Sequence, residues 1–138
     1  MKLIKTLLTI LFISLLSSPS WSVSLYNLVE REDLFYQKFS DVPFTGETTG
    51  DIQGSIKNGM FEGTWVYYHD NGQLQSKGNY KNSKRDGAWS NYWDNGQLIS
   101  EGNYKNGKKE GNWVGYDQNG TVWEPYTGTY KNGIKISD

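Results

Sequence analysis

Aromatic residues and glycines recur along this chain at a fixed interval, with polar turn residues between them. Trp65, Trp89 and Trp113 are 24 residues apart, and a glycine stands two positions before each of them. A period of this length is typical of repeat proteins, in which each unit leaves a face that only its neighbours can cover. The pattern therefore predicts an array of similar units rather than one irregular core.

A finer pattern of turn residues divides each unit into two strands. Asn-Gly is the strongest short hairpin signal, because a type I′ turn needs positive φ at both central residues. With Asn82-Ser83 in the one missing place, the steps from Asn to Asn are 13, 11, 13, 11, 13 and 13 residues. We expect an all-β fold, an elongated single-layer antiparallel β-meander of about 24-residue, two-strand repeats. The pairs are Asn58-Gly59, Asn71-Gly72, Asn95-Gly96, Asn106-Gly107, Asn119-Gly120 and Asn132-Gly133.

If every turn has two residues, the register of the strands follows. Trp65 then lies opposite Gly78, and Trp89 lies opposite both Ser76 and Gly102. Since side chains alternate between the two faces of a strand, the tryptophans share the packed face. We expect the ring of Trp89 to cover Gly102, because a large ring fills the gap that a strand glycine leaves. The same rule pairs His69 with Leu74, Trp93 with Leu98, and Gly87 with Gly78.

Two segments carry a family resemblance. Residues 78–89, GNYKNSKRDGAW, and residues 102–113, GNYKNGKKEGNW, are each followed by a tyrosine and an Asn-Gly turn. They resemble the bacterial MORN-type repeats of YwqK-like proteins, and degenerate copies extend the resemblance over about residues 43–135. The resemblance implies an elongated, twisted antiparallel sheet without catalytic residues. The last copy has two extra residues near Glu124-Pro125, where we expect a bulge or an edge.

The N-terminus predicts export. Lys2 and Lys5 precede an apolar stretch over residues 7–16, and Ser20-Trp21-Ser22 offers small residues for a signal peptidase. Residues 1–22 are therefore predicted to be a secretory signal peptide. The apolar stretch is shorter than the ~20 residues that a transmembrane helix needs, so we expect no transmembrane span in the mature chain. With no cysteine for a lipid anchor, the protein is expected to be periplasmic or secreted and not lipid-anchored.

The mature chain divides into two predicted parts. Residues 23–42 have mixed charge and no repeat, and a small hairpin there would cap the N-terminal end of the array. Residues 43–138 form the predicted repeat domain. Without Lys2 and Lys5, 14 − 2 = 12 basic residues stand against 15 acidic ones, a net charge of −3. This balance gives no electrostatic reason to expect nucleic-acid binding.

The sequence offers little for chemistry and two candidate surfaces for binding. The single histidine, His69, has no nucleophile or cysteine arranged around it, so we expect no enzyme activity, metal or cofactor. The first candidate is an aromatic face that suits sugar rings or a peptide, or is simply the core: Trp65, Tyr67, Trp89, Trp93 and Trp113. The second is an edge that could contact lipid phosphates or an anionic polymer, or is only a solvated turn: Lys84, Arg85, Lys108 and Lys109.

We therefore expect a non-enzymatic, exported repeat protein that serves as a protein–protein interaction module in the cell envelope. Open sheet edges and a long ribbon surface suit docking of another protein. One alternative is a cell-envelope glycan-binding module that uses the aromatic face. The resemblance to YwqK-like proteins, which often carry an antitoxin label, implies a further alternative, an immunity or antitoxin-like protein.

Overall fold

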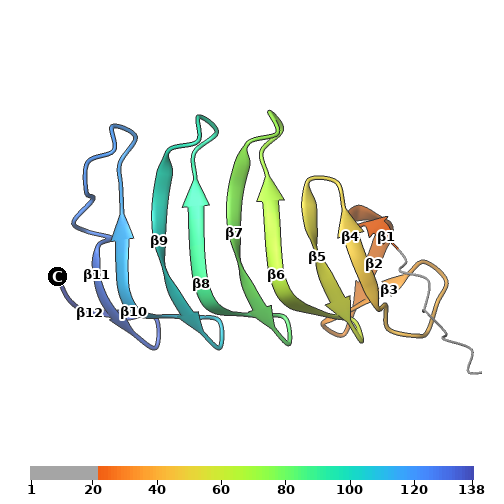
Figure 1. Cartoon of the computed structure of the whole chain (residues 1–138). Helices are drawn as coiled ribbons and strands as arrows, with labels where there is room; N and C mark the ends of the chain where they lie inside the picture. Colours follow the sequence, from red (N-terminus) through yellow and green to blue (C-terminus); the bar gives the residue numbers. More distant parts are fainter. Residues whose placement is uncertain (1–21) are drawn as a thin grey trace, which may run out of the picture.

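The computed structural model describes residues 22–138, so the predicted signal peptide lies outside the described residues except for Ser22. Ten strands form one open sheet in the order β1-β4-β5-β6-β7-β8-β9-β10-β11-β12, and β2 and β3 pair separately (Figure 1). The sheet strands are β1 (Ser22–Ser24), β4 (Gly46–Thr49), β5 (Ile52–Lys57), β6 (Met60–Tyr68), β7 (Leu74–Lys81), β8 (Lys84–Tyr92), β9 (Leu98–Lys105), β10 (Lys108–Gly115), β11 (Gly128–Lys131) and β12 (Ile134–Ser137).

The predicted single-layer meander is confirmed from β4 onward. Each of these strands pairs antiparallel with the next one along the chain. Figure 1 shows the strands side by side in one layer, perpendicular to the long axis of the molecule. The exception is at the N-terminal end, where β1 pairs parallel with β4. The turns line up along the two long sides of the sheet, where the strands end. We call these two sides the edges, and they differ in chemistry.

One edge consists of the predicted two-residue turns. Asn58, Asn82, Asn106 and Asn132 have φ between 49° and 52°, and the residue after each also has positive φ. This is the backbone of a type I′ turn, which matches the twist of the flanking strands. These turns join β5 to β6, β7 to β8, β9 to β10 and β11 to β12.

At the opposite edge the prediction of two-residue turns was wrong. Around Asn71-Gly72, the His69 N–H donates to the Gln73 carbonyl at 2.8 Å, and the Gly72 N–H donates to the His69 carbonyl at 2.7 Å. Only the glycine has positive φ, so these are three-residue loops, a type I turn followed by a glycine bulge. In consequence Leu74 pairs with Tyr68 instead of His69, and Leu98 pairs with Tyr92 instead of Trp93.

A bulge inside every second strand also changes the predicted register. Gly63, Gly87 and Gly111 have φ of 71°, 96° and 72°, a conformation that glycine adopts without steric cost. Tyr80 pairs with Arg85, but beyond Gly87 the register shifts and Gly78 pairs with Trp89. The predicted pairs Trp89–Ser76 and Gly87–Gly78 were therefore wrong. The predicted pairs Trp65–Gly78 and Trp89–Gly102 are present.

The core is a column of tryptophans. Trp65, Trp89 and Trp113 are 0%, 1% and 1% exposed. Tyrosines stand edge-on between them: Tyr80 lies 5.3 Å from Trp89 at 89°, and Tyr104 lies 5.0 Å from Trp113 at 78°. Edge-to-face pairs are a favourable aromatic geometry. This column allows a single-layer sheet to shield its central side chains from solvent.

Each tryptophan ring lies over a glycine of the preceding strand. Trp65 covers Gly54, Trp89 covers Gly78, and Trp113 covers Gly102. The prediction that Trp89 covers Gly102 was therefore wrong. Trp89 and Gly102 are paired in the ladder, but the ring lies over the glycine of the strand on the other side. Gly115 lies under the ring of Tyr126.

A short helix and a hairpin pack against the N-terminal end of the sheet. The 3₁₀ helix η1 (Leu25–Asn27) leads into β2 (Leu28–Arg31), which pairs with β3 (Leu34–Gln37). The Phe35 N–H donates to the Gly59 carbonyl, and the Phe35 ring stacks on Phe61 at 4.9 Å. The hairpin therefore covers the first two-residue turn. Its Leu28 joins Phe44, Ile56 and Trp65 in a buried cluster.

The chain leaves the regular sheet in its last copy. Between Gly115 and Gly128 there is only an isolated bridge from Tyr116 to Val122. Glu124 and Pro125, where the sequence has its two extra residues, are exposed in this irregular segment. Thr127 closes it, since its hydroxyl accepts a hydrogen bond from the Gly115 N–H at 3.0 Å. The two extra residues therefore lie outside the paired strands.

Candidate functional site

The predicted aromatic face is the closed core of the sheet. Its three repeat tryptophans are buried, and Tyr67 and Trp93 are half-buried. The Tyr67 hydroxyl lies 3.2 Å from the Tyr80 hydroxyl, so the polar end of this ring is engaged inside the face. Sugar rings stack on open aromatic faces, and the repeat tryptophans present none. Of the two interpretations of these rings, the structure favours the core.

The bend at each bulge glycine brings a further side chain over the tryptophan of the same strand. Phe61 stacks on Trp65 at 3.9 Å, and the Arg85 guanidinium lies 4.2 Å from the centre of the Trp89 ring. The Lys109 ammonium takes the equivalent place over Trp113, at 4.7 Å. A bulge increases the local bend of a strand, which is why residues four apart meet here. These three residues therefore cover the tryptophan rings of the aromatic column.

Arg85 and Lys109 therefore belong to the packing and not to the predicted anion-binding edge. Arg85 donates to the Tyr104 hydroxyl at 3.2 Å. The Lys109 ammonium lies 3.4 Å from the centre of Tyr126 and 4.7 Å from that of Tyr130. Burial lowers the pKa of Lys109, while the negative faces of the rings favour its cation. Both cations therefore have their interaction partners within the chain.

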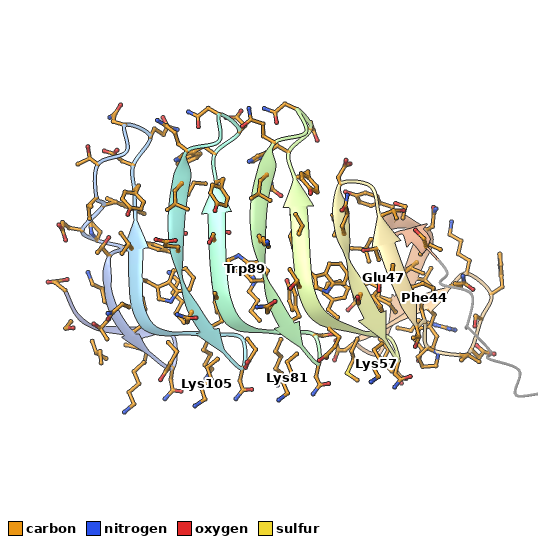
Figure 2. All side chains as sticks on the ribbon, in the orientation of Figure 1. Phe44, Glu47, Lys57, Lys81, Trp89 and Lys105 are labelled. Atoms are coloured by element: carbon orange, nitrogen blue, oxygen red, sulfur yellow. The ribbon has the colours of Figure 1, made fainter. Side chains whose placement is uncertain are left out.

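Lys84 and Lys108, the other two residues of the predicted edge, remain exposed beside the two-residue turns. They are joined there by lysines that the sequence analysis did not single out. Lys57, Lys81 and Lys105 end the strands before these turns, and Figure 2 shows them along one margin of the sheet, directed away from it. The signal was present in the sequence, since a lysine directly precedes each asparagine of this edge.

The face opposite the tryptophans is open. We call it the outer face. Its most regular feature is a row of half-buried tyrosines that end β6 and β8 and directly follow β10: Tyr68, Tyr92 and Tyr116. Beside them a cross-strand row of mixed character runs over five strands, from Val66 through Lys77, Ser90 and Glu101 to Val114. A shallow hollow lies between Thr64, Lys77, Asn79, Ala88, Ser90 and Tyr92. The outer face therefore combines aromatic, apolar and charged groups in a repeating order.

Within the part of the chain that the structure describes, the side chains that commonly bind metals are dispersed. His69 lies on a loop, with Nε2 2.9 Å from the Tyr92 carbonyl oxygen. Over residues 22–138, no three histidine, aspartate or glutamate side chains come together as metal ligands would.

A membrane-spanning helix is not found among the same residues.

Comparison with known proteins supports the repeat assignment. A family model described as "MORN repeat variant" matches residues 61–82 and 85–106, which lie in β6–β7 and β8–β9 with the turns between them. No curated protein matches the chain. Among solved structures, the chain is similar to one titled "Crystal structure of GtfA/B complex bound to UDP and GlcNAc", at 15% identity and a TM-score of 0.24. The match covers 71% of this chain and only 24% of that one, and so weak a superposition says nothing about function.

Proposed function

Since residues 61–82 and 85–106 match the MORN repeat variant, this chain is a MORN-type repeat protein. We propose that it is an exported, non-enzymatic module that binds another protein in the cell envelope. The repeats are consistent with a protein-binding role. The basic residues and apolar stretch before residue 22 support export. The buried tryptophans weaken the glycan alternative, which needs open rings.

The observation that carries the proposal is the tyrosine row of the outer face. Tyr68, Tyr92 and Tyr116 occupy equivalent positions in three successive repeats, so they lie about 9.5 Å apart, the width of two strands. Tyrosine is enriched at protein interfaces, because it combines a large apolar ring with a polar tip. Three such rings on a long, open sheet face suit a partner that lies across the strands.

Site-specific crosslinking in living cells tests the proposal. A photoreactive phenylalanine analogue replaces Tyr92 in the full chain, and the same analogue replaces Tyr26, which is 71% exposed in the N-terminal segment, as a control. We expect one crosslinked protein from the Tyr92 position and none from the Tyr26 position. Cell fractionation of the same samples shows whether the chain is exported.

Calorimetry with the identified partner then measures the contribution of the outer face. Tyr92→Ala should weaken binding at least about tenfold, as truncation of a central aromatic residue commonly does, while Tyr26→Ala leaves the affinity unchanged. Circular dichroism shows that both variants are folded. Equal crosslinking at the two positions, or equal affinities of the two variants, would show that the outer face is not the binding surface.

A further inference from the structure

Six lysines lie exposed along the edge of the two-residue turns, and we call this row the basic edge. In each central repeat one lysine ends the strand before the turn and another begins the strand after it. Figure 2 shows three of them, Lys57, Lys81 and Lys105, pointing away from the sheet on the same side. The full set is Lys57, Lys81, Lys84, Lys105, Lys108 and Lys131.

Four of the six lysines of the basic edge face one another across the ladder. Lys81 is paired with Lys84, and Lys105 is paired with Lys108. Like charges directly opposite each other destabilise a sheet. The arrangement recurs in both central repeats, so it is a regular feature of the edge that folding alone does not favour.

Acidic side chains of the protein do not neutralise this edge by ion pairing. The ion pairs within residues 22–138 are Arg31–Asp41 and Lys135–Asp138, neither of which includes a lysine of the basic edge. Three carboxylates close to these turns, those of Glu62, Asp86 and Glu110, accept hydrogen bonds from the backbone N–H groups of Asn82, Asn106 and Asn132 at 3.0, 3.2 and 2.9 Å. These carboxylates are thus bound by the backbone of the next turn along the sheet, and the lysines of the basic edge stay exposed to solvent.

The opposite edge has the opposite sign. Two of its three-residue loops carry Asp70 and Asp94, Asp117 directly precedes the third, and none of these loops contains a lysine or arginine. A chain with a net charge of −3 after residue 22 therefore places six of its 12 remaining basic residues on one line. Such a local field attracts an anion even when the whole molecule is acidic.

From these observations we propose that the basic edge binds an acidic polysaccharide, laid along the row of turns. Successive lysine pairs are about 9.5 Å apart, the width of two strands. A polysaccharide with one carboxylate, sulfate or phosphate in each disaccharide unit has charges at a comparable spacing. The site is separate from the outer face, so the proposal does not depend on the protein partner.

The groove between neighbouring turns supplies the polar groups that sugars require. Lys81, Lys84 and Lys105 line it together with Asn82, Asn103, Asn106 and Tyr104, and Asp86 and Glu110 line it as well. Amide and phenol groups donate and accept hydrogen bonds, as sugar hydroxyls do. The groove therefore offers hydrogen bonds between the charges, at the positions where uncharged sugar groups would lie.

Two other polyanionic partners fit the basic edge less well. Duplex DNA carries one charge per ~1.7 Å of its axis, far denser than the lysine pairs, and single strands are held by exposed aromatic rings. A membrane surface is a plane, whereas these lysines form a line. The central turns between them, Asn82-Ser83 and Asn106-Gly107, have no apolar side chain to insert among lipids.

Binding of hyaluronan oligosaccharides of defined length to the full chain tests the proposal, because hyaluronan has one carboxylate per disaccharide. We expect affinity to rise with length until the oligosaccharide spans the basic edge, and to fall with salt. Neutral dextran should not bind. Lys105→Glu should weaken binding about tenfold or more, whereas Lys38→Glu, with the same change in charge on an exposed residue away from the edge, should change it less than about twofold.

Several results would overturn the assignment. These are no binding of hyaluronan, equal losses in the two variants, or an affinity independent of length. Tighter binding to phosphatidylglycerol vesicles would assign the edge to membranes, and tighter binding to single-stranded DNA of equal charge would assign it to nucleic acid. Circular dichroism of both variants separates lost binding from lost folding.

Discussion

Substitution of Gly78 by alanine tests the tryptophan–glycine contact most directly. A Cβ on Gly78 would lie 1.8 Å from Cε3 and 2.4 Å from Cδ2 of Trp89, well inside van der Waals contact. The φ of Gly78 is not in the left-handed region, so alanine introduces a steric conflict without backbone strain. The indole must therefore move.

The surroundings of Trp89 leave its ring little room to retreat. The Tyr80 ring lies 5.3 Å away on one side, and the Arg85 guanidinium lies 4.2 Å above the ring. Inserting a methylene into a packed core costs about 1–3 kcal/mol, and a side chain enclosed in this way belongs at the upper end. We expect Gly78→Ala to lower the free energy of unfolding by about 2–3 kcal/mol.

Urea denaturation followed by tryptophan fluorescence measures this change, provided that the slope with denaturant stays constant. The matched control is the same substitution in a Trp89→Phe background, where the smaller ring can accommodate the added methyl group. There we expect alanine to cost less than about 1 kcal/mol, so the two substitutions are coupled. Additive costs, or a Gly78→Ala cost within about 0.5 kcal/mol of zero, would refute the contact.

Two further predictions concern the side chains around this contact. Burial raises the pKa of Tyr67, and its hydrogen bond with Tyr80 acts in the same direction. Since the unfolded value is about 10, the protonated phenol stabilises the fold below that pH, and the stabilisation is lost as pH rises above it. An ultraviolet titration should show a late tyrosine that ionises with unfolding and is absent from Tyr67→Phe; one common step in an intact fold would contradict this. Arg85→Gln should lower the free energy of unfolding by about 0.5–1 kcal/mol through the lost cation–π contact, while Arg85→Lys, which mimics Lys109, costs less. Equal losses in the two variants in chemical denaturation would show that the charge over Trp89 does not matter.

The spacing of turn residues was sufficient to predict the meander. Asn-Gly pairs at alternating steps indicate strand length and direction together, because a tight turn can only join antiparallel neighbours. The resemblance between residues 78–89 and 102–113 then implied the same unit twice. These signals are local in the chain, which is why they could be recognised without the structure.

The bulge at Gly87 could not be derived from the spacing alone. A register worked outward from a turn stays correct only until the first inserted residue, and every pair beyond it is displaced. The available signal was a glycine two positions before each tryptophan, since glycine inside a strand often marks a bulge. The two kinds of Asn-Gly turn also look alike in sequence, except that lysine precedes Asn82 and aspartate precedes Asn71.

The candidate sites depended on this same detail. Lys84 and Arg85 are neighbours in the sequence, yet one is exposed at the edge and the other lies over Trp89. Alternation along a strand predicts that they separate, but only the bend at Gly87 brings Arg85 onto the ring. The basic edge required both the strand ends and the turn type, and the tyrosine row of the outer face required knowing which face is closed.

The orientation of the strands also determines how the molecule would respond to tension. Figure 1 shows the strands across the long axis, so a pull between the two ends of the sheet separates neighbouring strands one hydrogen bond at a time instead of shearing a whole ladder. A two-strand repeat occupies about 9.5 Å of the sheet, and its 24 residues extend to roughly 80 Å when released. Under load, such a sheet would lengthen hairpin by hairpin at low force, as a compliant tether does.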